Sequence, residues 1–223
     1  MIGLPLLYVI GGTGFIHALT LGEAELLAMV PQRCFAAVNS FSLMAIPLFV
    51  LAGELMSYGG IMEKLTDMMR ALVGHIKGGM AYTTVLVGAA LGALLGSANA
   101  SAALLGDVMY PELKKDDYPG DFSASLITGT SVLGPIIPPS MVFVMYGVAA
   151  QVSISKLFFG GIIPGVLIVL AFFLVIGVTA RKYNFPSREK EPWKHRVMAV
   201  AKAAPALLIP LIILGGILTG VKI

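Results

Sequence analysis

The sequence predicts an all-α integral membrane protein, a multi-span helical bundle with a re-entrant helical hairpin and a discontinuous, broken transmembrane helix. Three observations predict this fold class. Of the 223 residues, 57% are hydrophobic and 12% are charged, with a mean hydropathy of +0.91, a composition that soluble domains of this size do not normally have. Long apolar runs alternate with short charged connectors. Two further uncharged stretches carry polar residues, glycines or prolines at their centres.

Charge and cysteine content exclude several classes of protein. The net charge of +3 is small and the basic residues are scattered, so we read them as topology signals and expect no nucleic-acid partner. A single cysteine, Cys34, excludes an internal disulfide, and the three histidines lack metal-ligand spacing. Redox and zinc chemistry are therefore not expected.

Four apolar runs have the length of ordinary membrane spans, which need roughly 20 residues each. They lie near residues 3–19, 41–57, 157–180 and 203–220. The connector at 181–198 contains "RKYNFPSREKEPWKHR", with six Lys or Arg against two Glu. The positive-inside rule makes it a cytoplasmic loop.

The stretch 59–77 has a different pattern. Ile61, Leu65, Met68 and Leu72 recur at helical spacing with charged residues between them. This periodicity predicts an amphipathic helix that lies in the membrane interface. Its basic residues favour the cytoplasmic side.

The stretch 78–113 is predicted to be a re-entrant hairpin. Residues 78–106 carry no charge, and their centre reads "LLGSANASAALLG". A lone serine in a membrane helix usually bonds its own backbone, but a Gly-Ser-x-Asn-x-Ser run is good turn chemistry. If the basic flanks of this stretch both face the cytoplasm, the chain enters and leaves on one side.

The stretch 121–151 is predicted to be two half-helices with an unwound link. Its segment "TSVLGPIIPPS" holds Gly134, Pro135, Pro138 and Pro139, and proline removes a backbone donor and clashes with the preceding turn. The alternative is a proline kink that only shapes helix packing, but a kink needs only one breaker.

Unwound backbone at membrane depth is tolerated where it is buried in protein or lines a polar cavity. Secondary transporters use such breaks to bind substrates and coupling ions. Half-helix N-termini attract anions, while freed carbonyls and Ser, Thr or Asn oxygens suit a hard cation such as sodium. A hairpin tip that meets a broken helix would make such a site.

Three segments carry a family resemblance: "AIPLFVLAGELMSYGGI" at 45–61, "LLGSANASAALLG" at 94–106, and the block at 129–165 that begins "GTSVLGPIIPPSMVFVMYG". The chain resembles the large membrane (permease) subunit, DctM-like, of tripartite ATP-independent periplasmic (TRAP) transporters. The likeness covers nearly the whole chain, and "GPIIPPS" followed by "MYG" is its most specific part. It implies that 1–223 is a single membrane domain, the N-terminal half of a permease and one repeat of an inverted-repeat, elevator-type transporter.

The resemblance also implies an activity. It is secondary active transport of an organic acid (a dicarboxylate, sialic acid or similar carboxylate) across the bacterial inner membrane, coupled to Na⁺ and with no other cofactor. The implied partners are a small membrane subunit and a periplasmic substrate-binding protein. No enzymatic activity and no catalytic residue are expected.

The resemblance carries over to eight candidate residues for binding ion or substrate, four on the hairpin tip and four on the unwound link. They are Gly96, Ser97, Asn99 and Ser101 on the tip, and Thr130, Ser131, Gly134 and Pro135 on the link. Within this set, our hypothesis is that Na⁺ is held by Ser97, Asn99, Ser131 and Gly134.

Other classes of function remain as alternatives. The same polar residues could serve packing in a structural helical bundle, or line a channel that conducts sodium down its gradient without a binding protein. An intramembrane enzyme would need a nucleophile with a base. Ser97 and Ser131 have no His, Lys or paired acids nearby in the sequence at membrane depth.

Overall fold

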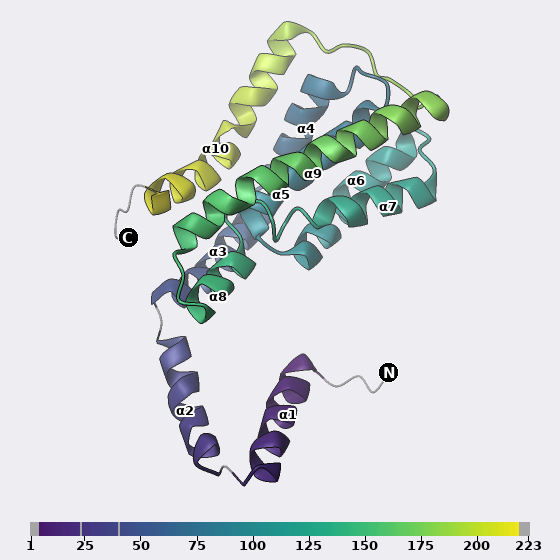
Figure 1. Cartoon of the computed structure of the whole chain (residues 1–223). Helices are drawn as coiled ribbons and strands as arrows, with labels where there is room; N and C mark the ends of the chain where they lie inside the picture. The colour runs from purple at the N-terminus through teal and green to yellow at the C-terminus, as the bar shows by residue number, and fades with distance from the viewer. Residues whose placement is uncertain (1–4, 23, 40, 219–223) are drawn as a thin grey trace. The chain divides into compact units, whose positions relative to one another are not determined.

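The computed structural model describes residues 5–22, 24–39 and 41–218. Every regular element in these ranges is a helix. The chain divides into two compact units, Met1–Ala45 and Ile46–Ile223, which are described separately below (Figure 1).

The smaller unit contains α1 (Leu6–Thr20) and α2 (Ala24–Val38), and α3 (Phe41–Tyr58) crosses the boundary between the units. The α1 helix matches the predicted span at 3–19. The sequence pattern predicted no element over α2, because Glu25, Pro31 and Arg33 interrupt its apolar run.

The larger unit holds the remaining helices. They are α4 (Ile61–Val73), α5 (Gly79–Leu95), α6 (Ala98–Lys115), α7 (Gly120–Ser131), α8 (Met141–Ala149), α9 (Ile154–Lys182) and α10 (Trp193–Leu218). Among the described residues, α9 alone combines the length and apolar composition that crossing a membrane requires. In Figure 1, α9 is the long helix that runs along this unit, and it packs on α5 and α8.

The amphipathic helix α4 buries its apolar face against protein. Met62, Leu65, Met68 and Ala71 are buried, and α4 packs on α5 and α10. This contact explains the helical spacing of its apolar residues. Its placement in the membrane interface stays a prediction.

The connectors that precede α5, follow α6 and follow α9 meet at one end of the larger unit. The backbone N–H of Arg188 donates to the carbonyl of Gly74 at 3.2 Å. Its guanidinium donates to Asp116 at 2.7 and 2.8 Å and to Glu112 at 3.4 Å. We call this set of contacts the Arg188 clamp. Its hydrogen bonds to Asp116 raise the pKa of Arg188 and keep the guanidinium charged.

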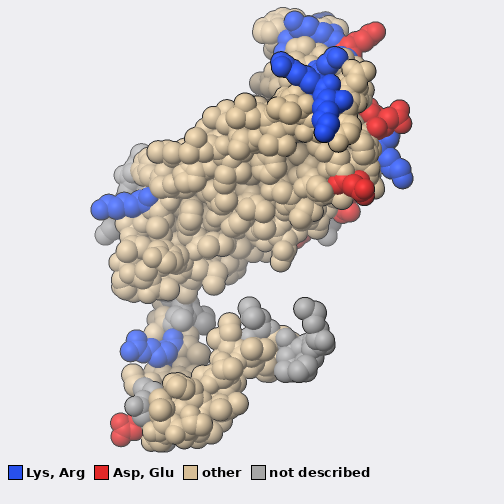
Figure 2. Space-filling view, turned by 45° about the vertical axis from the view of Figure 1, so that its right-hand side comes forward, with Lys and Arg blue, Asp and Glu red and all other residues tan. Residues whose placement is uncertain are grey.

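The Arg188 clamp fixes both ends of the α5–α6 pair at the same end of the unit. The N–H of Gly78 also donates to the carbonyl of Pro186 at 3.1 Å, just before α5 begins. Figure 2 shows charged side chains gathered at this end, above a broad uncharged flank. The two helices therefore start and finish beside the basic connector, which is non-helical at 183–192 and lies within the predicted loop at 181–198.

Candidate functional site

The turn between α5 and α6 lies against the link between α7 and α8. Helix α5 ends at Leu95, Gly96 adopts a left-handed conformation with φ of +60°, and Ser97 is extended before α6 begins. A Cβ on Gly96 would lie 3.0 Å from the backbone nitrogen of Met141 and 3.3 Å from the carbonyl oxygen of Pro139. Glycine at this position thus allows both the backbone conformation and the close approach.

The link begins later than the sequence predicted. Thr130 and Ser131 were expected in unwound backbone, but they form the last turn of α7, and the non-helical link covers 132–140. The reason is that the helical winding continues as tight turns: the N–H of Leu133 donates to the carbonyl of Thr130, and that of Gly134 to Ser131, each at 3.0 Å. Gly134 and Pro135 lie within the link, as predicted.

Ser140 closes the link and was missed as a site residue. Its buried hydroxyl donates to the carbonyl of Pro135 at 2.7 Å and accepts from the N–H of Phe143 at 3.5 Å, so it caps α8. The bond between Pro138 and Pro139 is cis. A serine placed directly before an apolar helical run is the signal that identifies such a cap.

Glycines on one face of α5 let α7 and the link approach its backbone. A Cβ on Gly88 would collide with the Cγ2 of Thr130. One on Gly92 would lie 3.0 Å from the carbonyl oxygen of Leu133. The spacing of four residues places these glycines and Gly96 on one side of the helix.

Two buried hydroxyls near this contact lack hydrogen-bond partners in the described part of the chain. Ser101 and Thr130 are each 0% exposed, and neither Ser101 Oγ nor Thr130 Oγ1 is bonded. Gly134 lies against the tip: a Cβ there would be 2.9 Å from the carbonyl oxygen of Ser97 and 3.1 Å from Ser101 Oγ. Buried polar groups normally find partners, so these two oxygens mark a candidate site.

The other predicted residues are less closely associated with those oxygens. The side chain of Ser131 donates to the carbonyl of Thr128 at 2.7 Å. Asn99 is exposed on the first turn of α6, and Ser97 is half-buried. The structure therefore brings Ser97, Ser101 and Gly134 together and leaves Asn99 at the surface.

The link lies partway along α9. A Cβ on Gly161 would lie 2.7 Å from the carbonyl oxygen of Ile136, and one on Gly165 would lie 2.9 Å from Ile137. At 1.5 Å per residue, these glycines are about 11 and 17 Å from the start of a helix about 44 Å long. The hairpin turn and the link thus meet at an interior level of α9.

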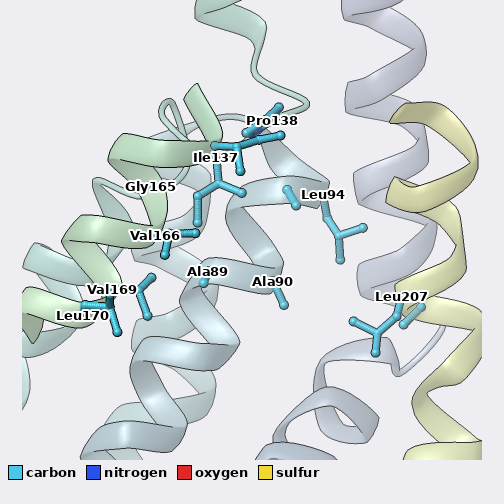
Figure 3. Close-up of a pocket in the computed structure, with 13 residues that line it drawn as sticks. Ala89, Ala90, Leu94, Ile137, Pro138, Gly165, Val166, Val169, Leu170 and Leu207 are labelled. Atoms are coloured by element: carbon cyan, nitrogen blue, oxygen red, sulfur yellow. The ribbon is translucent and has the colours of Figure 1, made fainter. Parts of the chain in front are cut away.

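An apolar groove of about 560 Å³ flanks the link (Figure 3). Ala89, Ala90 and Leu94 contribute from α5, Ile137 and Pro138 from the link, and further apolar side chains from α9 and α10. None of the described residues that line it has a charged or hydroxyl side chain. This groove does not suit a carboxylate, which requires polar donors.

Four helix ends converge near the unpartnered hydroxyls. The C-terminal ends of α5 and α7 carry partial negative charge, and the N-terminal ends of α6 and α8 carry partial positive charge. Within the described ranges, no group of three or more His, Cys, Asp or Glu side chains could hold a metal ion. Any ion here would therefore meet hydroxyl and carbonyl oxygens, which bind hard cations.

An all-helical bundle in which one described helix has the length and apolar composition to cross a membrane is typical of helical membrane proteins. The family model described as "Tripartite ATP-independent periplasmic transporter, DctM component" matches residues 1–223. The chain belongs to this family, and the resemblance predicted from the sequence is confirmed.

Several curated relatives are similar over most of this chain. A putative TRAP transporter large permease protein of Haemophilus influenzae is 37% identical over 86% of the chain and 48% of its own length. The 2,3-diketo-L-gulonate TRAP transporter large permease protein YiaN of Escherichia coli is 35% identical over 98% and 51%. The C4-dicarboxylate TRAP transporter large permease protein DctM of Vibrio cholerae is 35% identical over 99% and 49%.

The chain spans about half the length of these relatives. They are named as transporter permeases, which supports the prediction that this chain is not an enzyme.

Proposed function

We propose that this chain forms one ion- and substrate-binding half of a large permease that carries organic acids across the bacterial inner membrane by secondary active transport. The observation that carries the proposal is the pair of buried, unpartnered hydroxyls of Ser101 and Thr130 near the contact of hairpin turn and link. Family membership supports it, because relatives are named for transport of C4-dicarboxylate and 2,3-diketo-L-gulonate.

Sodium is the proposed coupling ion. Its ligands would come from the hydroxyls of Ser101 and Thr130, from backbone carbonyls at the C-terminal ends of α5 and α7, and from the carbonyl of Ser97, the residue that caps α6. Oxygen ligands of this kind suit a hard cation, and a cation would satisfy two oxygens that are otherwise costly to bury. Ser131 and Gly134 would contribute backbone oxygens, and Asn99 would have to turn inward to join them.

The substrate carboxylate would lie at the N-terminal ends of α6 and α8. Free backbone N–H groups and the helix dipole both favour an anion at such ends. The anion would then lie at the N-terminal ends of α6 and α8, and the cation at the C-terminal ends of α5 and α7. Because these four helix ends lie close together, the charges of the two ligands would attract each other and couple their binding. The same arrangement supports the re-entrant placement of the hairpin and the discontinuous transmembrane helix.

The partners and the motion are part of the proposal. A small membrane subunit and a periplasmic substrate-binding protein would work with the permease, and the hairpin and link would move together in an elevator-type cycle. Support comes from the family alone. A channel would instead pass sodium without accumulating the acid, so uptake of labelled acid against its gradient separates the two functions.

Thermal unfolding of the full-length permease in sodium and in choline tests the site. Thr130→Val and Ser101→Ala remove the unpartnered hydroxyls, and Thr128→Val is a matched control, because its hydroxyl bonds the carbonyl of Ala124 on the exposed side of α7. We expect sodium to stabilise the unaltered protein and the control, but not the double variant. A sodium effect that persists in the double variant would refute the proposed ligands.

Cysteine labelling tests the re-entrant placement. In a Cys34→Ser background, Lys77→Cys and Lys114→Cys report the two ends of the hairpin and Asn99→Cys reports its tip. We expect a membrane-impermeant reagent to reach both ends from the cytoplasmic side and to miss the tip from the periplasm in the absence of transport. Free labelling of the tip from the periplasm would show two complete spans instead.

A further inference from the structure

A small notch lies between α4 and α10, which pack side by side (Figure 1). Its lining comes from two turns of α10 and one of α4. The lining residues are Lys64, Asp67, His195, Met198, Ala199 and Lys202. We call this surface the α4–α10 notch. It is separate from the hairpin turn and the link.

Two lysines in the notch carry charge that the described residues do not neutralise. Asp67 is engaged by the guanidinium of Arg70 at 2.6 Å. His195 Nδ1 lies 2.9 Å from the carboxylate of Glu191. Lys64 and Lys202 have no acidic partner within the described ranges. Two ammonium groups from different helices thus share one notch, and an anion between them would relieve their repulsion.

The position of Lys202 on α10 places the notch at a polar–apolar boundary. From Ala203 to the end of α10 at Leu218 no residue is charged. A lysine that begins such a run buries its aliphatic stem and turns its ammonium group back towards the N-terminal end of the helix. At that end Trp193 is 75% exposed, and exposed tryptophans are enriched at headgroup level.

Exposed apolar side chains lie on α10 within the notch and farther along the helix. Met198 is 45% exposed, Val200 39% and, farther along α10, Leu208 52%. A free inorganic anion would gain no binding energy from these apolar side chains, whereas the acyl chains of a lipid would pack against them. The notch therefore combines two cationic side chains with an adjoining apolar stretch of α10.

We propose that the α4–α10 notch binds the headgroup phosphate of an anionic phospholipid, with Lys64 and Lys202 as its two cationic contacts. Bound lipid would join α4 to α10 at the membrane surface. A lysine near an anionic membrane surface contributes about 1 kcal/mol, which corresponds to a roughly fivefold change in affinity. Loss of both lysines should weaken binding by about 25-fold.

Lipid titration of the purified, detergent-solubilised chain tests the proposal. The rise in unfolding temperature is measured against added phosphatidylglycerol, phosphatidylcholine or inorganic phosphate. The test variant is Lys64→Gln with Lys202→Gln. The charge-matched control, Lys114→Gln with Lys194→Gln, removes two exposed lysines outside the notch.

We expect phosphatidylglycerol alone to stabilise the unaltered chain and the control, with the half-saturating concentration about 25-fold higher in the test variant. Equal weakening in both double variants would overturn the site, because the attraction would then depend on net charge only. Stabilisation by inorganic phosphate that competes with the lipid would overturn the assignment to a lipid. If the test variant fails to fold, Lys64→Arg with Lys202→Arg replaces it, and loss of lipid binding there would also refute the proposal.

Discussion

Replacing Gly134 with alanine tests whether the hairpin turn and the link form one packed site. A Cβ at this position would lie 2.9 Å from the carbonyl oxygen of Ser97 and 3.1 Å from Ser101 Oγ. Both atoms belong to the hairpin tip, and the carbonyl is backbone, which cannot rotate away. The φ of Gly134 lies outside the left-handed region, so any cost comes from packing and not from backbone conformation.

The magnitude follows from two opposing effects. Overpacking a tight contact costs about 1–3 kcal/mol. Alanine also restricts the unfolded chain more than glycine does, which stabilises the folded state by about 0.4–1 kcal/mol. We expect the free energy of unfolding to fall by about 1–2 kcal/mol, which lowers the unfolding temperature of a chain of this size by roughly 2–8 °C.

Thermal unfolding in detergent measures this change, and Gly106→Ala provides the matched control. A Cβ on Gly106, within α6, would meet no atom within 4 Å, so helix propensity should stabilise that variant by up to about 1 kcal/mol. In the full-length permease, Gly134→Ala should also weaken the sodium-dependent stabilisation, because it separates Ser97 from the link. An unfolding temperature at or above that of the unaltered protein, with an intact sodium effect, would refute the close packing described for this site.

Three further predictions concern the connectors. Arg188→Gln should lower the free energy of unfolding by about 1 kcal/mol, since the clamp is partly exposed, and thermal melts equal to those of the unaltered chain would contradict it. Burial raises the pKa of Tyr118 from its ordinary value of 10 to about 12. Stability is therefore unaffected below pH 10 and falls by about 3 kcal/mol as pH rises through 12, because the unfolded chain then binds one proton fewer. Tyr118→Phe should flatten that alkaline decline, and an unchanged pH profile would argue against it. Ser140→Ala should cost about 1 kcal/mol through loss of the α8 cap, whereas the exposed Ser125→Ala should stay within about 0.5 kcal/mol.

Much of the larger unit could be predicted from local sequence signals. Gly96 and Ser97 form the turn of a helical pair, as their turn chemistry indicated, and Gly134 to Pro139 interrupt the helix that precedes them. These features depend on residues adjacent in sequence, where glycine, serine and proline act directly on the backbone. The tight turns that continue from α7 to Gly134 are held by backbone hydrogen bonds. The amino-acid composition of this segment does not predict them.

The chemistry of the site was harder to predict than its location. Asn99 was the most polar candidate on the hairpin, yet it is exposed, while Ser101 and Thr130 are fully buried. Whether a hydroxyl is buried without a partner depends on how α6 and α7 are rotated about their axes where they pack on α5. This rotation is set by tertiary packing and not by the local sequence. The same is true of Ser131, whose hydroxyl is used by its own helix.

The Arg188 clamp joins residues that the ribosome makes at different times. Arg188 follows Asp116 by 72 residues, so at 5–20 residues per second it emerges roughly 4–14 s later. Throughout that interval the acidic base of the hairpin has no partner from the connector. Synthesis of α9 must come first, because α9 lies between them in the chain. The base of the α5–α6 pair therefore stays unlatched until the following long helix and its connector have been made.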